Sequence, residues 1–198
     1  MAIIVDKVQK RKDIALACKE LFIEQGIENL TISQITTNAG IGKGTLYDYF
    51  KNKEDIVFEI VNILVEERNI IKEQKLSQIS RTKDKVKLFS TFFYSEEDAE
   101  LRAIYKEFIS ISLLKQDEDR IAYQTACTNS YYEWFKKIIQ EGIDKGELIQ
   151  KSGRFARGLF VMAEGMFITS EVTNSIENLE EEIHNNIDAI FDLIEVKK

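Results

Sequence analysis

The side chains best suited to chemistry in this chain of 198 residues gather between residues 42 and 53. Gly42 and Gly44 stand at the expected start of a short helix, where open backbone N–H groups attract anions. Lys43 adds a mobile positive charge between them, and Thr45 is short enough to lie against base edges or a thymine methyl group. Together these residues predict a surface suited to phosphate oxygens and bases.

Further polar groups extend this surface toward the next helix. Tyr47 and Tyr49 place hydroxyl groups where phosphate oxygens would run, although Tyr47 could equally pack against the first helix. Lys53 adds a cation at the start of the following helix. The run Gly-Lys-Gly-Thr lacks the spacing of a nucleotide-binding loop and follows no strand, so it predicts no nucleotide site.

Two short helices must position these groups. Thr31 is a good N-cap, and a glutamine three residues later completes a capping box. Gly40 permits the left-handed backbone of a tight turn between the helices, and Leu46 and Phe50 are expected in the core beneath. Residues 31–50 therefore predict a helix-turn-helix, whose second helix enters the major groove of DNA.

Apolar residues recur at helical spacing along the rest of the chain as well. The chain has no proline and only nine glycines, which argues against the many tight turns of an all-β fold. We therefore predict an all-α fold of about nine helices. Their expected ranges are 13–26, 31–39, 43–49, 52–71, 82–94, 95–114, 120–145, 152–174 and 179–196.

Charge divides the chain into two regions. Residues 1–55 contain eight basic and eight acidic side chains, so the whole net charge of −7 lies on residues 56–198. Within the neutral part, four basic residues form a small basic arm: Lys7, Lys10, Arg11 and Lys12. The split indicates two regions with different partners, although a merely solvated surface would give the same pattern.

Residues from about 10 to 60 resemble the DNA-binding domain of the TetR family of transcriptional repressors. The matching residues are Ala17, Leu21, Phe22, Gly26, Thr31, Ile35, residues 39–50 (AGIGKGTLYDYF), Lys53 and Glu54. Beyond them the resemblance depends on chain length, helix content and the Gly-Glu-Leu segment at residues 146–148. It implies a DNA-binding domain at residues 1–54, with its motif at 31–50, and a ligand-binding and dimerisation domain at residues 55–198.

The resemblance also implies which residues contact DNA. These are Thr31, Gly42, Lys43, Gly44, Thr45, Tyr47, Tyr49 and Lys53. The family often has serine where Gly42 stands, which removes one hydroxyl contact but leaves the amide, and Thr36 replaces a common alanine. Asp48 is an acid within the reading helix; it either points away from DNA or accepts a hydrogen bond from a cytosine amino group.

The second region is rich in aromatic residues. Residues 86–167 hold 14 of the 20 aromatic side chains, and the resemblance implies an effector pocket between the helices there. Tyr105, Tyr131 and Trp134 combine an aromatic ring with a polar group, so they are the predicted pocket residues, with core packing as the alternative. Glu164 lies within an apolar stripe, where it marks the edge of the buried face, pairs across a dimer interface or meets a cationic ligand.

Two C-terminal helices are predicted to form a dimer interface. Residues 159–168 are apolar nearly all round, which requires burial on more than one side. Gly158 and Gly165 share a helix face and would allow a second helix to approach closely. With Phe160, Ile187 and Ile190 they form the predicted interface, and burial within one chain is the alternative.

Several classes of site are disfavoured by composition. Cys18 and Cys127 lack metal-ligand spacing, and His184 is the one histidine, so no metal or cofactor is expected and no serine-histidine-acid set is available. Cys18 falls on an apolar stripe, where a buried thiol is expected rather than a redox sensor. No segment approaches the roughly 20 apolar residues of a membrane helix. We expect a protein of the reducing cytoplasm that is not an enzyme.

The sequence thus predicts a ligand-responsive transcriptional regulator. We expect a homodimeric repressor that binds a pseudo-palindromic DNA operator and is released by a small apolar or aromatic effector. The alternatives are an enzyme or small-molecule carrier with an incidental helix-turn-helix, and a protein-interaction module with an acidic face. A gel shift with genomic fragments distinguishes the first hypothesis from the other two.

Overall fold

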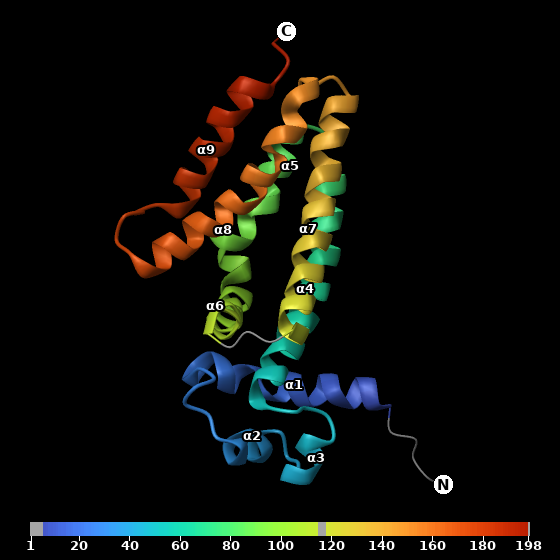
Figure 1. Ribbon diagram of the computed structural model, residues 1–198, viewed down its shortest axis with the longest axis vertical. Helices are drawn as coiled ribbons and strands as arrows, with labels where there is room; N and C mark the ends of the chain where they lie inside the picture. Colours follow the sequence, from blue (N-terminus) through green and yellow to red (C-terminus); the bar gives the residue numbers. More distant parts are fainter. Residues whose placement is uncertain (1–5, 115–117, 198) are drawn as a thin grey trace. The chain divides into compact units, whose positions relative to one another are not determined.

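The computed structural model describes residues 6–114 and 118–197, except for the side chains of residues 119 and 120. The described residues form nine α-helices and three short 3₁₀ helices (Figure 1). This confirms the predicted all-α class. The α-helices are α1 (Lys7–Gln25), α2 (Ile32–Asn38), α3 (Lys43–Tyr47), α4 (Lys53–Ser77), α5 (Thr82–Ser90), α6 (Ala99–Leu114), α7 (Glu118–Asp144), α8 (Ala156–Val172) and α9 (Leu179–Ile194).

Side-chain caps fix the beginnings of several helices. Asp6 accepts hydrogen bonds from the backbone N–H groups of Val8 and Gln9, so α1 begins at Lys7 rather than near residue 13. The basic arm is therefore helical. The predicted capping box at Thr31 is present, and Asn52 caps α4 by accepting from the backbone N–H of Asp55 at 2.9 Å.

The predicted helix starts at Ser95 and Ser152 fall at 3₁₀ turns instead of at the beginnings of α-helices. Ser95 precedes the 3₁₀ helix η2 (Glu96–Asp98), and α6 follows it directly. Ser152 lies inside η3 (Gln150–Phe155), which leads into α8. A third 3₁₀ helix, η1 (Thr91–Phe93), continues α5. Short 3₁₀ turns are common at the ends of α-helices, and sequence periodicity does not distinguish the two.

The chain divides into two compact units, and α4 runs through both. The first unit comprises Met1–Asn69 and Glu100–Asp117, so α6 groups with the N-terminal helices. Within it the Lys19 ammonium of α1 is hydrogen-bonded to the Glu100 carboxylate of α6, which raises the pKa of Lys19. The rings of Phe58 and Phe108 meet edge to face with centroids 5.0 Å apart. These contacts explain why α6 belongs to this unit.

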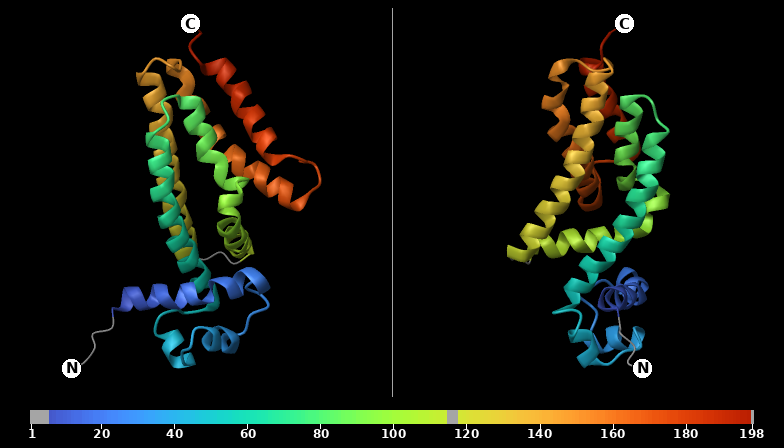
Figure 2. Two further views of the ribbon diagram at one scale, coloured as in Figure 1. Left: turned by 180° about the vertical axis from the view of Figure 1, so that it is seen from behind. Right: turned by 90° about the vertical axis from the view of Figure 1, so that its right-hand side faces the viewer.

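The second unit comprises Ile70–Ala99 and Glu118–Lys198. Its core is built by α5, α7, α8 and α9 around buried residues such as Phe135, Leu159, Ile187 and Phe191. The loop after α8 turns the chain back so that α9 packs on α8 (Figure 2). The isoleucine stripe predicted on the last helix is present, and Ile183, Ile187 and Ile194 are buried in this core.

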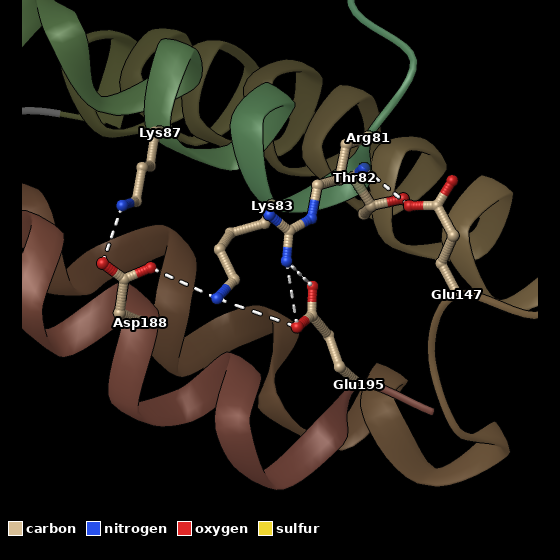
Figure 3. A network of polar contacts seen from close by, with 7 residues as sticks. All are labelled: Arg81, Thr82, Lys83, Lys87, Glu147, Asp188 and Glu195. Atoms are coloured by element: carbon tan, nitrogen blue, oxygen red, sulfur yellow. Dashed lines mark hydrogen bonds and ion pairs between the residues drawn. The ribbon is translucent and has the colours of Figure 1, made fainter. Parts of the chain in front are cut away.

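A network of polar contacts joins α5 to α9 and to the segment after α7 (Figure 3). Lys87 and Lys83 reach Asp188 at 2.7 and 3.3 Å, and Arg81 lies 2.9 Å from Glu195. The lysines lower the pKa of Asp188, chiefly through the hydrogen bond from Lys87.

Glu147 joins the same network through the backbone. Its carboxylate accepts a 2.7 Å hydrogen bond from the Thr82 N–H and so caps α5. Burial opposes the ionisation of Glu147, but the hydrogen bonds from Thr82 and the charges of Lys145 and Lys85 together outweigh it and leave the pKa below its ordinary value.

Candidate nucleic-acid interface

The short helix α3 packs against the core on one side and is exposed on the other. Leu46 and Phe50 are almost completely buried and anchor it in the core of the N-terminal unit. The exposed positions are Gly42, Lys43, Gly44, Thr45, Tyr47 and Asp48. Since only one side of α3 is anchored, the other side presents small, cationic and hydroxyl-bearing groups, followed by the acidic Asp48.

The turn before α3 has the geometry that its sequence predicts. Gly40 adopts a left-handed φ of +64°, and the Ile41 N–H donates to the Thr36 carbonyl at 3.0 Å to close the turn. Ile35 is fully buried beside it. Thr36 is buried as well, and its hydroxyl donates to the Ser33 carbonyl oxygen at 3.1 Å, so threonine in place of the common alanine leaves no unsatisfied group.

The predicted contact residues fall into two groups. Gly42, Lys43, Gly44, Thr45 and Tyr47 lie on the open side of α3, and Tyr47 is 55% exposed, which favours a surface role over packing against α1. The second group, Thr31, Tyr49 and Lys53, is engaged within the protein.

Each member of this second group has internal partners. The Thr31 hydroxyl accepts from the Gln34 backbone N–H at 3.3 Å and lies 2.7 Å from the Gln34 Oε1. Tyr49 is half-buried, and its carbonyl oxygen accepts a hydrogen bond from Arg11. The exposed edge of Thr31 and the Tyr49 hydroxyl are the parts that remain predicted contacts.

Lys53 has a structural role that its sequence position did not reveal. Its ammonium donates to the carbonyl oxygens of Ile27, Glu28 and Leu30 at 2.6, 3.3 and 3.1 Å. These carbonyls belong to the loop between α1 and α2, so Lys53 ties that loop to the start of α4. A contact 23 to 26 residues away leaves no periodic signal in the sequence.

Half of the basic arm is used in the same way. Arg11 pairs with Glu59 at 2.7 Å and Lys12 with Glu66 at 3.5 Å, and both acids lie on α4.

Cys18 is fully buried on α1, and burial raises the pKa of its thiol to about 11. A thiol that stays protonated is a poor nucleophile, which agrees with a packing role.

The predicted pocket residues lie in two aromatic clusters. Tyr131 and Trp134 stack with centroids 6.3 Å apart, and both meet Phe89 edge to face in the C-terminal unit. Tyr105 belongs to the N-terminal unit and stacks on Phe108 at 5.9 Å. The structure therefore brings two of the three predicted residues together.

A shallow hollow of about 280 Å³ lies elsewhere on the C-terminal unit. Its lining includes Tyr132, Lys136, Lys137 and Gly153, and none of the predicted pocket residues. The Arg157 guanidinium covers the Tyr132 ring at 3.5 Å. The lining also includes Glu133, which pairs with Lys136 at 2.9 Å, so the charges around this hollow are mixed.

The five predicted interface residues also separate. Gly158 and Gly165 are exposed on α8, and a Cβ at either would meet no atom within 4 Å. Ile187 is fully buried inside its own chain, and Phe160 and Ile190 pack against the same core, so these three serve intramolecular packing. Glu164 is half-buried beside Ala163 and Phe167, at the edge of the buried face.

Sequence reasoning missed further exposed apolar side chains, which lie on the glycine face of α8 and near the end of α9. Val161, Ile168 and Val172 are exposed on α8, and Leu193 and Val196 are exposed near the end of α9. Val172 and Leu193 are 74% and 71% exposed. With the two glycines, the α8 residues recur at steps of three and four, which places them on one face. That spacing was a signal available in the sequence.

Other kinds of site find little support in the described part of the chain. Those residues contain no group of three or more side chains that could hold a metal ion. The His184 Nε2 lies 2.9 Å from the Tyr94 hydroxyl, which gives the lone histidine a packing partner. Among the described helices, none combines the length and hydropathy that crossing a bilayer requires.

An all-helical chain whose N-terminal unit exposes the second helix of a helix-turn-helix has the features of a DNA-binding protein. A family model described as "Bacterial regulatory proteins, tetR family" matches residues 14–60. Over its full length the chain resembles the crystal structure of a TetR-family transcriptional regulator from Cytophaga hutchinsonii, with a TM-score of 0.80, 15% identity and coverage of 98% of this chain and 99% of that one. Residues 14–60 thus match the DNA-binding motif of TetR-family regulators, and the described chain has the fold of a solved TetR-family structure.

A curated relative matches part of the chain by sequence. The HTH-type transcriptional regulator SAB2452 of Staphylococcus aureus (strain bovine RF122 / ET3-1) is 39% identical over 56 residues. That match covers 28% of this chain and 30% of the relative, so it spans less than a third of either protein.

Two further solved structures share the fold. A Saccharomonospora viridis protein in complex with choline has a TM-score of 0.76 at 15% identity, covering 96% of this chain and all of that one. A Clostridium perfringens protein described as a fatty acid metabolism regulator has a TM-score of 0.62 at 26% identity, covering 93% of this chain and all of that one.

Proposed function

We propose that this protein is a homodimeric transcriptional repressor that binds a pseudo-palindromic operator and is released by a small apolar or aromatic effector. The observation that carries the proposal is the one-sided anchoring of α3. Leu46 and Phe50 fix the helix from the core, while Lys43, Thr45 and Tyr47 stay exposed. A helix held in this way enters a groove without unfolding its own unit.

The exposed groups divide the work of recognition. Lys43 and the hydroxyls of Tyr47 and Tyr49 contact phosphates, which fix the register of the protein on the duplex. Gly42 and Gly44 let the backbone approach a phosphate closely, and Thr45 reaches base edges. Asp48 follows α3 and is exposed, and in this proposal its carboxylate points away from the phosphates.

The dimer uses the exposed apolar side chains of α8 and α9. Gly158 and Gly165 leave room beside Val161 and Ile168, so a second helix can approach closely there. Exposed apolar side chains gathered on one helix face favour association with a like face. Two-fold symmetry would make the contact isologous and would match an operator with two related half-sites.

The effector binds among aromatic rings. Tyr131 and Trp134 are half-buried beside Phe89, so a small apolar molecule could replace part of their packing. Structural relatives include a choline complex and a protein described as a fatty acid metabolism regulator, which favours a lipophilic or quaternary ammonium compound. Trp134 is the chain's one tryptophan, so its fluorescence reports binding at this cluster.

The decisive experiment is recovery of genomic DNA fragments bound by the purified protein, followed by titration of the recovered site at several salt concentrations. Affinity should fall steeply as salt rises, because phosphate contacts release counterions. Lys43→Ala should weaken binding and reduce the salt slope by about 1. Lys151→Ala removes an exposed lysine from the C-terminal unit and should leave both unchanged. A protein that retains no fragment contradicts the proposal.

A further inference from the structure

Arg11 makes three contacts that converge on the end of the reading segment. Its Nε lies 2.7 Å from the Glu59 Oε2 on α4, and its Nη1 donates to the Tyr49 carbonyl oxygen. Its guanidinium carbon lies 4.2 Å from the centroid of the Phe50 ring. One side chain of α1 therefore holds α4 and the two residues that lead out of the α3 region.

The charge of Arg11 is already neutralised in this arrangement. The Glu59 side chain is 14% exposed and the Arg11 side chain 34%, so their ion pair is only partly accessible to water. Partial burial strengthens a charge-assisted hydrogen bond and makes its loss costly. The charge and hydrogen-bond donors of this guanidinium are already engaged within the protein, so it is poorly suited to bind a phosphate.

The carbonyl that Arg11 holds lies close to the predicted DNA surface. Tyr49 follows α3 by two residues, and its hydroxyl is one of the predicted phosphate contacts. The next residue, Phe50, is 1% exposed and anchors the segment in the core. With the carbonyl fixed by Arg11 and the next ring buried, the direction of the Tyr49 side chain is set from inside the protein.

We infer that Arg11 is a positioning residue for DNA recognition that acts through Tyr49 and Glu59 and does not itself touch DNA. The inference rests on the proposed DNA-binding function. It removes Arg11 from the basic arm and assigns it to the support of the reading helix. The planar guanidinium is essential to this role, because a lysine ammonium cannot meet Glu59, the Tyr49 carbonyl and the Phe50 ring together.

The test compares Arg11→Lys with Lys43→Ala on the recovered operator over a range of salt concentrations. Arg11→Lys keeps the positive charge, so a simple charge contact with a phosphate at this position would keep most of its affinity. A positioning role instead predicts a loss of about tenfold or more with an unchanged salt slope. Lys43→Ala should reduce the slope by about 1. Wild-type affinity in Arg11→Lys overturns the inference.

Glu59→Gln provides an independent test, because the two explanations predict opposite changes in DNA affinity. Removing a negative charge from the DNA-binding unit strengthens DNA binding if only electrostatics matter. Positioning predicts the opposite, a severalfold weaker complex, because a neutral amide in place of the carboxylate would hold the guanidinium less firmly. Tighter binding by Glu59→Gln therefore overturns the inference even if Arg11→Lys folds poorly.

A double-mutant cycle separates positioning from a general loss of structure. All variants are measured at a temperature where circular dichroism shows the native helix content. If Arg11 acts through Tyr49, Tyr49→Phe costs much less in the Arg11→Lys background than alone. Additive losses overturn the inference while leaving the proposed function intact. Failure of the wild-type protein to bind any duplex instead contradicts the proposed function itself.

Discussion

Cations serve different purposes in the two units of this protein. In the N-terminal unit Lys53 and Arg11 donate to backbone carbonyls of segments beside the reading helix. In the C-terminal unit Lys83 and Lys87 pair with the Asp188 carboxylate, and Arg81 pairs with Glu195. The first arrangement fixes the conformation of a chain segment, whereas the second links helices through flexible side chains.

The difference has an energetic consequence. Exposed ion pairs contribute about 0 to 1 kcal/mol each, because water screens them and long side chains lose entropy. A cation removed from several carbonyls leaves acceptors without a donor, which costs about 1 to 3 kcal/mol. Changes in the N-terminal unit should therefore alter both stability and DNA affinity. Changes in the C-terminal network should alter stability alone.

Gly142→Ala should give the largest loss of stability. A Cβ at this position would lie 2.5 and 2.8 Å from the Thr82 side chain and 3.0 Å from a Leu148 methyl group. Thr82 is buried, so α5 and α7 must move apart, at a cost of about 3 kcal/mol. The thermal midpoint should fall by about 6 to 12 °C.

Gly153→Ala is the matched control, because a Cβ there meets no atom within 4 Å and this exposed glycine lies outside the proposed DNA and dimer contacts. It should change the stability by less than about 0.5 kcal/mol. At temperatures where the Gly142→Ala variant is folded, this variant should bind the operator with wild-type affinity. Equal midpoints for the two variants would contradict the close packing between α5 and α7.

Lys53→Met should have the second largest effect on stability and should also weaken DNA binding. The carbonyls of Ile27, Glu28 and Leu30 lose their shared donor, which lowers the free energy of unfolding by about 2 kcal/mol. The loosened loop adjoins α2, so operator affinity should also fall in the folded variant. Lys43→Met, an exposed lysine on α3, should change stability by less than about 0.5 kcal/mol. Equal stability of the two variants would contradict the role of Lys53 in holding the loop between α1 and α2.

The N-terminal motif could be predicted because its signals are local. The Thr31 capping box, the left-handed Gly40 and the buried Leu46 each depend on neighbours within a few residues. All three follow from turn and helix geometry alone. For the same reason the fold class and most helices could be read from spacing.

The roles of Arg11, Lys53 and Ile187 could not be predicted in the same way. Arg11 and Lys53 find partners 23 to 48 residues away, and a charged side chain in the sequence looks alike whether it meets a carbonyl or a phosphate. Ile187 lies on an apolar stripe that fits either a second copy or the chain's own core. Only the packing of α9 in the structure shows that Ile187 lies in the core of its own chain.

Glu147→Ala should have a smaller effect that depends on pH. The carboxylate caps α5 through the Thr82 N–H, and losing a cap costs about 1 kcal/mol. Because the pKa of Glu147 is lowered in the folded chain, its contribution is complete above the ordinary glutamate pKa and is lost as the pH falls through the folded value. Thermal midpoints of wild type and variant should therefore converge in acid. Operator affinity should not change, and a constant gap from pH 7 to pH 3 would contradict the role of the charge.

Asp188→Asn should give the smallest effect. Lys87 and Lys83 lower the pKa of Asp188, so its contribution is present above the ordinary aspartate pKa and disappears as the pH falls through the lowered folded value. The side chain is 43% exposed, so screening reduces the contribution to about 0.5 kcal/mol or less. The gap between wild type and variant should also close at 1 M salt, where the Debye length is about 3 Å. Asp192→Asn, an exposed change on the same helix, should leave the midpoint unchanged throughout. If Asp188→Asn instead persisted as a large loss at high salt, the C-terminal network would be holding its helices as firmly as the carbonyl contacts hold the reading helix, and the contrast between the two units would disappear.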